Sequence, residues 1–331
     1  YYGDGKVVVY NTETEQKIEI NRAKDAKLSP NSDFIVYKIY PYTDTLRALK
    51  LKKTDKKKLP KDSLGIMVFK NKETMSSENI HSFELPEKNS SWLAFLNSEK
   101  EVEDTTKKEE KKKRFDKEAP KEYSLTILNP VMNKKYQFKN ITEFSISKNS
   151  TLISFIKQQN DTLLKSTIYT FNTEKEILDS LESKMGLSKK ISADHEGNYF
   201  AFVHSDDTIK TKVYSLYLYN NQKGLLNKVV DTLTKDIPEN WTVSENGRIY
   251  FSENNQRLFF GIAPKPQPEP EDTLLDEEKV VLDLWSWTDP LLQPQQLSNL
   301  DRELKRTYLT VYHISDNKLV QLENEKIKRT E

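Results

Sequence analysis

Cysteine is absent from the 331 residues of this chain, which excludes disulfides, thiol nucleophiles and thiolate metal sites. No stretch reaches the roughly 20 consecutive apolar residues of a membrane-spanning helix, so no membrane span is expected. The chain also has no large excess of either charge, since 52 Lys and Arg balance 51 Asp and Glu to a formal net charge of +1. The chain therefore has no long-range field that would gather nucleic acid or anionic lipid.

The motifs of common catalytic centres are missing as well. No two of the eight glycines are four residues apart, which excludes the G-x-S-x-G elbow of a serine nucleophile. P-loops, dinucleotide fingerprints and H-E-x-x-H are absent too. The adjacent glutamates at 109–110 and 277–278 lie in charged and proline-rich stretches that we interpret as solvated loops.

The four histidines are far apart in the sequence: His81, His195, His204 and His313. His195 lies in the segment Asp194-His-Glu-Gly197, which we interpret as an ordinary hairpin turn rather than a metal corner. We therefore predict no catalytic, cofactor-binding or metal-binding residue in this chain, and no hydrolytic activity of the chain alone.

Three twelve-residue segments are near-copies of one another, and they start at residues 144, 191 and 241. Their sequences are FSISKNSTLISF, ISADHEGNYFAF and WTVSENGRIYFS. Each reads as a short strand, a polar turn and a second strand, with alternating apolar residues. A period of about 50 residues is typical of the four-stranded blade of a β-propeller. We expect the three copies to form equivalent hairpins.

A weaker fourth copy covers Leu28–Tyr37, and most copies follow a strand that ends in asparagine. These preceding strands are Val7–Asn11, Leu125–Asn129, Ile168–Asn172 and the run that ends at Asn220. Because the chain has only 8 glycines, asparagine and other small polar residues must supply the turns.

A less regular blade is expected between the first and second units. Its strands are predicted at Thr45–Leu51, Leu64–Phe69, Asn79–Leu85 and Trp92–Leu96. Charged runs at 52–61 and 107–118 and a proline-rich run at 263–278 predict loops outside the blades. The fold class is thus all-β, a propeller of about five or six four-stranded blades in one domain over 1–331.

The segment Leu282–Leu297 carries two tryptophans, Trp285 and Trp287, which alternate on one face of an expected strand. They form either a stacking platform for a ligand or a packing contact between blades, and packing is favoured. Downstream, Tyr308–Ile314 and Lys318–Leu322 predict a hairpin that opens another blade. The propeller is therefore expected to be incomplete at the C-terminal end of this chain.

Four segments support a family resemblance. They are LKKTDKKKLPKDSLGI near the start of the chain, WSWTDPLLQPQQL, and the downstream LKRTYLTVYHI and NKLVQL. Together they resemble the N-terminal propeller region of bacterial serine peptidases of the prolyl oligopeptidase family, of the dipeptidyl aminopeptidase type. The resemblance covers essentially the whole chain. It implies a propeller that caps an α/β-hydrolase domain and admits short peptides, with the catalytic Ser, Asp and His downstream of this sequence.

The resemblance names two partners, the hydrolase domain of the same parent chain and short peptide substrates, and it implies no cofactor. It favours a periplasmic or exported location and leaves the cytoplasm open. This sequence lacks the paired-glutamate segment with which some dipeptidyl peptidases hold a substrate amino terminus.

Two other functions are open at this point. One is a stand-alone propeller that binds a protein or glycan with its loops. The other is a propeller glycosidase, which needs two carboxylates facing each other. The lack of repeated acidic residues at the starts of the inner strands argues against the glycosidase. A hydrolase sequence after residue 331 would favour the peptidase.

Overall fold

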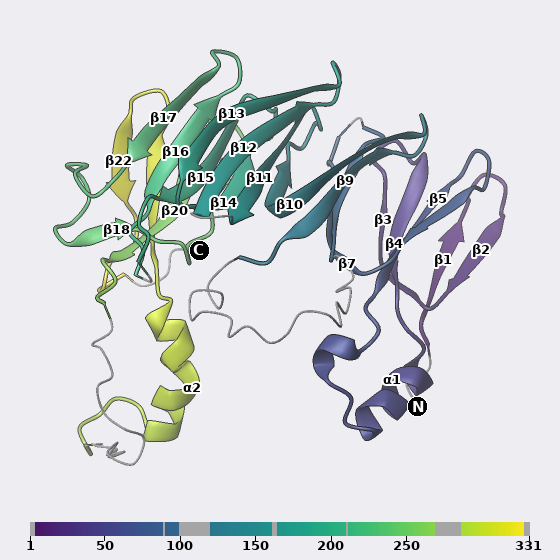
Figure 1. The fold of residues 1–331 in the computed structure, drawn as a ribbon, viewed down its shortest axis with the longest axis horizontal. Coiled ribbons are helices and arrows are strands. Elements are labelled where there is room, and N and C mark those ends of the chain that lie inside the picture. Colours follow the sequence, from purple (N-terminus) through teal and green to yellow (C-terminus); the bar gives the residue numbers. More distant parts are fainter. Residues whose placement is uncertain are drawn as a thin grey trace. The chain divides into compact units, whose positions relative to one another are not determined.

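The computed structural model describes residues 4–88, 90–98, 120–160, 164–209, 211–268 and 286–327. Strands dominate these residues (Figure 1). The chain forms two compact units, one of residues 1–185, 191–200 and 219–225, the other of 186–190, 201–218 and 226–331. The described helices are too short and too polar to cross a membrane.

The first residues form a hairpin and a four-stranded antiparallel sheet. The hairpin pairs β1 (Lys6–Tyr10) with β2 (Lys17–Asn21). The sheet follows the order of the sequence: β3 (Ala23–Leu28), β4 (Phe34–Ile39), β5 (Ser63–Val68) and β6 (Thr74–Ser77). Between β4 and β5 lie helix α1 (Thr43–Leu51) and the short helix η1 (Lys56–Lys58).

A seven-stranded sheet follows and contains two blades that share one long strand. Its strands are β7 (Ile80–Glu84), β8 (Leu93–Asn97), β9 (Tyr123–Asn129), β10 (Lys134–Ile146), β11 (Leu152–Asn160), β12 (Leu164–Asn172) and β13 (Ile177–Met185). The first half of β10 pairs with β9, and its second half pairs with β11. Thus β10 is the last strand of one four-stranded meander and the first strand of the next.

Two further antiparallel sheets complete the described fold. One has the order β14 (Leu187–Ala193), β15 (Tyr199–Ser205), β16 (Ser215–Asn220), β17 (Leu225–Val230). The other contains β18 (Trp241–Val243), β20 (Arg257–Pro264), β21 (Tyr308–His313) and β22 (Lys318–Gln321), with β19 (Tyr250–Phe251) added to β20. Helix α2 (Gln293–Leu304) precedes β21. The described sheets hold five four-stranded meanders, which confirms the all-β class with propeller blades.

Asparagine side chains close four of the turns between neighbouring strands, as the scarcity of glycine predicted. In each case the side-chain Oδ1 accepts a backbone N–H two or three residues further along, at 2.9–3.0 Å. The residues are Asn11, Asn129, Asn172 and Asn220. This local turn replaces the backbone freedom that glycine would give.

The blades are held together by large side chains between the sheets. One core cluster includes Trp92, Phe155 and Phe171, and another includes Phe34 and Leu93. Phe155 is 1% exposed, and its ring lies 4.9 Å from the Phe138 ring and 5.4 Å from the Tyr169 ring. Buried aromatic residues of this kind supply much of the free energy that stabilises a β-sheet core.

Two of the predicted copies form hairpins, and so does the weak fourth copy. Segments 144–155 and 28–37 pair through β10–β11 and β3–β4, and 191–202 joins neighbouring strands β14 and β15. In the third copy, both β18 and β19 pair with β20 instead of with each other. The reason is a close backbone approach, since a Cβ on Gly247 would lie 2.7 Å from the Gly261 Cα.

Three expectations for the irregular segments were wrong. Thr45–Leu51 is helical, because Leu46 and Leu49 follow helix spacing among strong helix formers. The hairpin at Tyr308–Ile314 supplies the last two strands of the final described sheet rather than a new blade. Ala263 and Pro264 belong to β20.

The structure describes only part of the predicted loop runs. Residues 52–61 contain no strand, and 265–268 are exposed. The run at 107–118 and residues 269–278 lie outside the described residues. The strands predicted at Leu64–Phe69, Asn79–Leu85 and Trp92–Leu96 correspond to β5, β7 and β8.

Candidate functional site

A cleft of about 470 Å³ opens between β3, β4 and β7, in the first compact unit. Its lining residues are Asp25, Ala26, Lys27, Lys38, His81, Ser82 and Phe83. It is the candidate functional site, because it combines charged side chains with an aromatic wall in a concave surface, as small-ligand sites do.

β-Bulges shape the cleft from both sides. The pairing of β3 with β4 shifts between Lys24 and Lys27, where Asp25 has a left-handed φ of 50°. The pairing of β7 with β8 shifts between Ile80 and Ser82. A bulge places an extra residue on one strand and turns its side chain in a new direction. Both bulged segments, at Asp25 and at His81, therefore project into the cleft.

The bulge itself is a repeated feature of this fold, because β10 shifts against β11 at the corresponding place, between Ile141 and Glu143. At the cleft, the two bulged strands β3 and β7 carry Lys27 and His81.

Asp25 holds two of the polar groups in position. Its carboxylate lies 3.2 Å from the Lys38 Nζ and accepts a hydrogen bond from the Tyr40 hydroxyl at 3.0 Å. The Tyr40 bond and then Lys38 lower the pKa of Asp25. At neutral pH Asp25 is therefore ionised, and its negative charge offsets the positive charge of Lys38.

Lys27 has a different environment. Its Nζ lies 5.5 Å above the centre of the Phe83 ring, a cation–π contact that leaves the ammonium group accessible. Among the described residues, no carboxylate forms an ion pair with Lys27. The Glu84 carboxylate acts on Lys27 electrostatically without forming an ion pair, so Lys27 remains a cation of the cleft that a ligand can contact.

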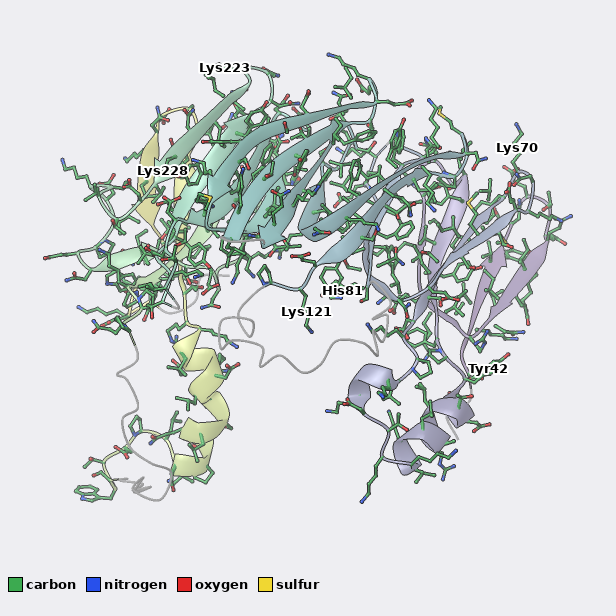
Figure 2. All side chains as sticks on the ribbon, viewed as in Figure 1. Tyr42, Lys70, His81, Lys121, Lys223 and Lys228 are labelled. Atoms are coloured by element: carbon green, nitrogen blue, oxygen red, sulfur yellow. The ribbon has the colours of Figure 1, made fainter. Side chains whose placement is uncertain are left out.

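His81 contributes a flat, neutral surface. Its ring stacks on Tyr123 with the ring centres 4.2 Å apart and the planes 14° from parallel. Burial, followed by the charges of Lys121 and Lys61, lowers the pKa of His81. His81 and Lys121 are labelled in Figure 2, beneath β7 and β9. At neutral pH this imidazole is uncharged and suited to stacking or hydrogen bonding.

The second compact unit contains a serine, a histidine and an aspartate in hydrogen-bonded sequence. The Ser188 Oγ lies 2.9 Å from the His204 Nδ1, and the His204 Nε2 lies 2.9 Å from the Asp206 Oδ1. The order of groups is that of a catalytic triad. Their exposure is the reverse of that in a working triad, whose serine is accessible and whose aspartate is buried. Ser188 and His204 are 1% and 2% exposed, whereas the Asp206 side chain is 82% exposed.

This burial decides the role of the cluster. A nucleophilic serine must meet its substrate, and the aspartate of a working triad is the buried member. The Ser188 hydroxyl is instead enclosed, so the cluster links β14 to β15 as a structural element. Sequence reasoning missed it by treating His204 as isolated, although Ser188 and His204 lie just outside the two ends of the 191–202 copy, where hairpin pairing brings them together.

The turn at Asp194–Gly197 is a hairpin turn, as interpreted from the sequence. Asp194 is 0% exposed, and its Oδ1 accepts the Asn198 N–H at 2.9 Å. Its Oδ2 has no hydrogen-bond partner among the described residues. Burial raises the pKa of Asp194, and nearby backbone N–H groups oppose the rise. Within the described residues, no three His, Asp or Glu side chains gather as a metal site.

The tryptophan prediction was wrong for Trp287. It lies in a turn ahead of α2 rather than on a strand, and it is 90% exposed instead of packed between blades. Asp289 accepts the Ser286 N–H at 2.9 Å and stabilises this turn. Trp285 lies outside the described residues.

No protein-family profile matches the chain, and no curated protein matches it. Among solved structures, TolB from Acinetobacter baumannii is similar at 10% identity and a TM-score of 0.42, over 97% of this chain and 60% of that one. The β-propeller domain of the Trilobed protease from Pyrococcus furiosus is similar at 12% identity and a TM-score of 0.40, over 78% and 70%.

The acylaminoacyl peptidase of Pyrococcus horikoshii is similar at 12% identity and a TM-score of 0.42, over 78% of this chain. The matched region spans 38% of that peptidase. At these TM-scores the likenesses assign no activity to this chain.

Proposed function

We propose that this chain is the non-catalytic propeller part of a serine peptidase of the prolyl oligopeptidase family, of the dipeptidyl aminopeptidase type. In this proposal, a hydrolase domain elsewhere in the parent polypeptide carries the catalytic Ser, Asp and His. The substrates are short peptides, and the blades limit which of them reach the hydrolase domain.

The observation that carries the proposal is the coincidence of repeated four-stranded meanders with the family-like stretches in one chain. The stretch at residues 51–66 leads into the central strand β5, and the stretch from 304 to 322 contains the hairpin β21–β22. The sequence that resembles the family therefore belongs to blade strands as well as to loops.

A mainly steric role suits the chemistry of the described residues. The Ser188–His204–Asp206 cluster encloses its hydroxyl, so it offers no nucleophile to a substrate. The antiparallel sheets are rigid because their backbone groups are paired along each strand. A rigid set of blades excludes folded proteins and admits flexible peptides.

The location of catalysis is tested with a fluorophosphonate serine probe and a dipeptidyl chromogenic substrate. The purified chain of residues 1–331 is expected to be neither labelled nor active, whereas the parent protein is expected to be labelled at a serine outside this region and to turn over the substrate. Labelling of a serine within 1–331 would refute the proposal. A silent parent would refute it as well and would favour a stand-alone binding propeller.

A further inference from the structure

We propose that the cleft between β3 and β7 binds the C-terminal carboxylate of a short peptide, with Lys27 as the main cationic contact. This inference deepens the proposed function and rests on it for the peptide class. The evidence lies in the charge, the shape and the walls of the cleft.

Positive charge exceeds negative charge around the cleft. Five lysines contribute to its electrostatics: Lys24, Lys27, Lys38, Lys61 and Lys121. Three carboxylates oppose them: Asp25, Asp62 and Glu84. Asp25 is engaged by Lys38 and Tyr40, and burial raises the pKa of Asp62. The cleft is therefore locally cationic on a chain whose formal net charge is only +1, which favours an anionic ligand group.

The remaining walls favour an organic anion over a bare inorganic one. Phe83 lies under the Lys27 ammonium group, and the His81 ring, which is stacked on Tyr123, supplies a flat uncharged surface. The pKa of His81 is lowered, so its ring adds no charge at neutral pH. A ligand that pairs one carboxylate with an adjoining apolar side chain would satisfy both walls. The last residue of a peptide has this composition.

The position of Asp25 would set the orientation of the ligand. Its carboxylate repels another carboxylate beside Lys38, whereas the Lys27 ammonium group lines the same cleft next to Phe83. The incoming carboxylate is therefore expected near Lys27, with the apolar side chain on Phe83. A cleft of about 470 Å³ has the size of sites that hold small ligands.

The test measures binding of acetyl-Ala-Ala-Phe, as the free acid and as the C-terminal amide, to the chain of residues 1–331 by isothermal titration. We expect the free acid to bind and the amide to bind about tenfold more weakly, since one charge-assisted contact is lost. Binding of the acid should weaken as sodium chloride is added.

The key variant is Lys27→Met, which keeps an apolar stem over Phe83 and removes the charge. We expect it to weaken binding of the free acid about tenfold and to leave binding of the amide unchanged. The matched control is Lys70→Met, an exposed lysine in the turn between β5 and β6, which Figure 2 shows well apart from His81. The control should bind as the unchanged chain does, and equal melting temperatures would show that both variants fold.

Three results would overturn the inference: no binding of the free acid, equal binding of acid and amide, or no effect of Lys27→Met. Displacement of the peptide by acetate at the same concentration would also overturn it, because the apolar walls would then contribute nothing. None of these results bears on the fluorophosphonate labelling of the parent protein, so failure here is distinct from failure of the proposed function.

Discussion

Replacing Asp194 by asparagine should make the chain more resistant to rising pH. Asp194 is fully buried in the hairpin turn between β14 and β15, and its Oδ2 has no partner among the described residues. Burial raises its pKa above the ordinary value of 3.8. Asparagine keeps the oxygen that accepts the Asn198 N–H and cannot ionise.

The sign follows from linkage between protonation and folding. At pH values below 3.8 the carboxyl group is protonated in both the folded and the unfolded chain. As pH rises, the unfolded chain ionises first, and the folded chain must then either keep its proton or bury a charge. The stability contribution of Asp194 is therefore lost as pH rises through its raised pKa, and Asp194→Asn escapes this loss.

The size of the effect comes from placing a charge on a buried carboxyl group whose Oδ2 has no hydrogen-bond partner among the described residues, since the asparagine amide stays uncharged. A buried polar group without a hydrogen bond costs about 1–3 kcal/mol, and the three backbone N–H groups that face Asp194 recover part of the cost for the ionised form. We therefore expect the variant to gain about 1–2 kcal/mol over the unchanged chain between low pH and neutral pH.

Urea unfolding followed by tryptophan fluorescence, from about pH 4 to about pH 8, measures this difference. Other titrating groups cancel when the variant is compared with the unchanged chain at each pH. Asp316→Asn is the matched control, because Asp316 is exposed, and it should show no such trend. A difference between Asp194→Asn and the unchanged chain that stays constant with pH would refute the reasoning.

Two further predictions concern the cores of the units. Phe155→Ala should lower the free energy of unfolding by about 3–5 kcal/mol, because the side chain is 1% exposed and packs between Phe138 and Tyr169. Urea unfolding measures this loss. A loss below about 1 kcal/mol would show that Phe155 is not packed as described. Ser188→Ala should lower the free energy of unfolding by about 1 kcal/mol, the net value of a buried hydrogen bond. It should leave fluorophosphonate labelling and peptide turnover of the parent protein unchanged. Loss of labelling would instead assign Ser188 a chemical role.

Local patterns predicted most of the strands and turns. Short runs rich in apolar residues located β5, β7 and β8 within a residue or two, because strands packed inside a sheet core form such runs. Asparagines such as Asn172 marked turns correctly, since an asparagine side chain can close a turn with its own neighbours. Both signals act within a few residues of the chain.

Apart from the helix at Thr43–Leu51, which local spacing indicates, the main errors came from interactions between distant residues. The third copy does not pair with itself, because Gly247 and Gly261 allow two backbones to touch, and no local pattern encodes that approach. The candidate cleft joins Lys27 to His81, from two different sheets, and its bulges are shifts of a single residue that alternation alone does not reveal. The Ser188–His204 contact likewise needs the pairing of strands before it can be seen.

The central claim, that these blades admit short peptides and exclude larger substrates, is tested most directly on the parent protein. The measurement is kcat/KM for a dipeptidyl chromogenic substrate, for a short oligopeptide and for a long folded protein that contains the same cleavable sequence in an exposed loop. The account predicts turnover of the first two and a value for the folded protein lower by at least about a hundredfold. Comparable kcat/KM values for all three substrates would contradict it.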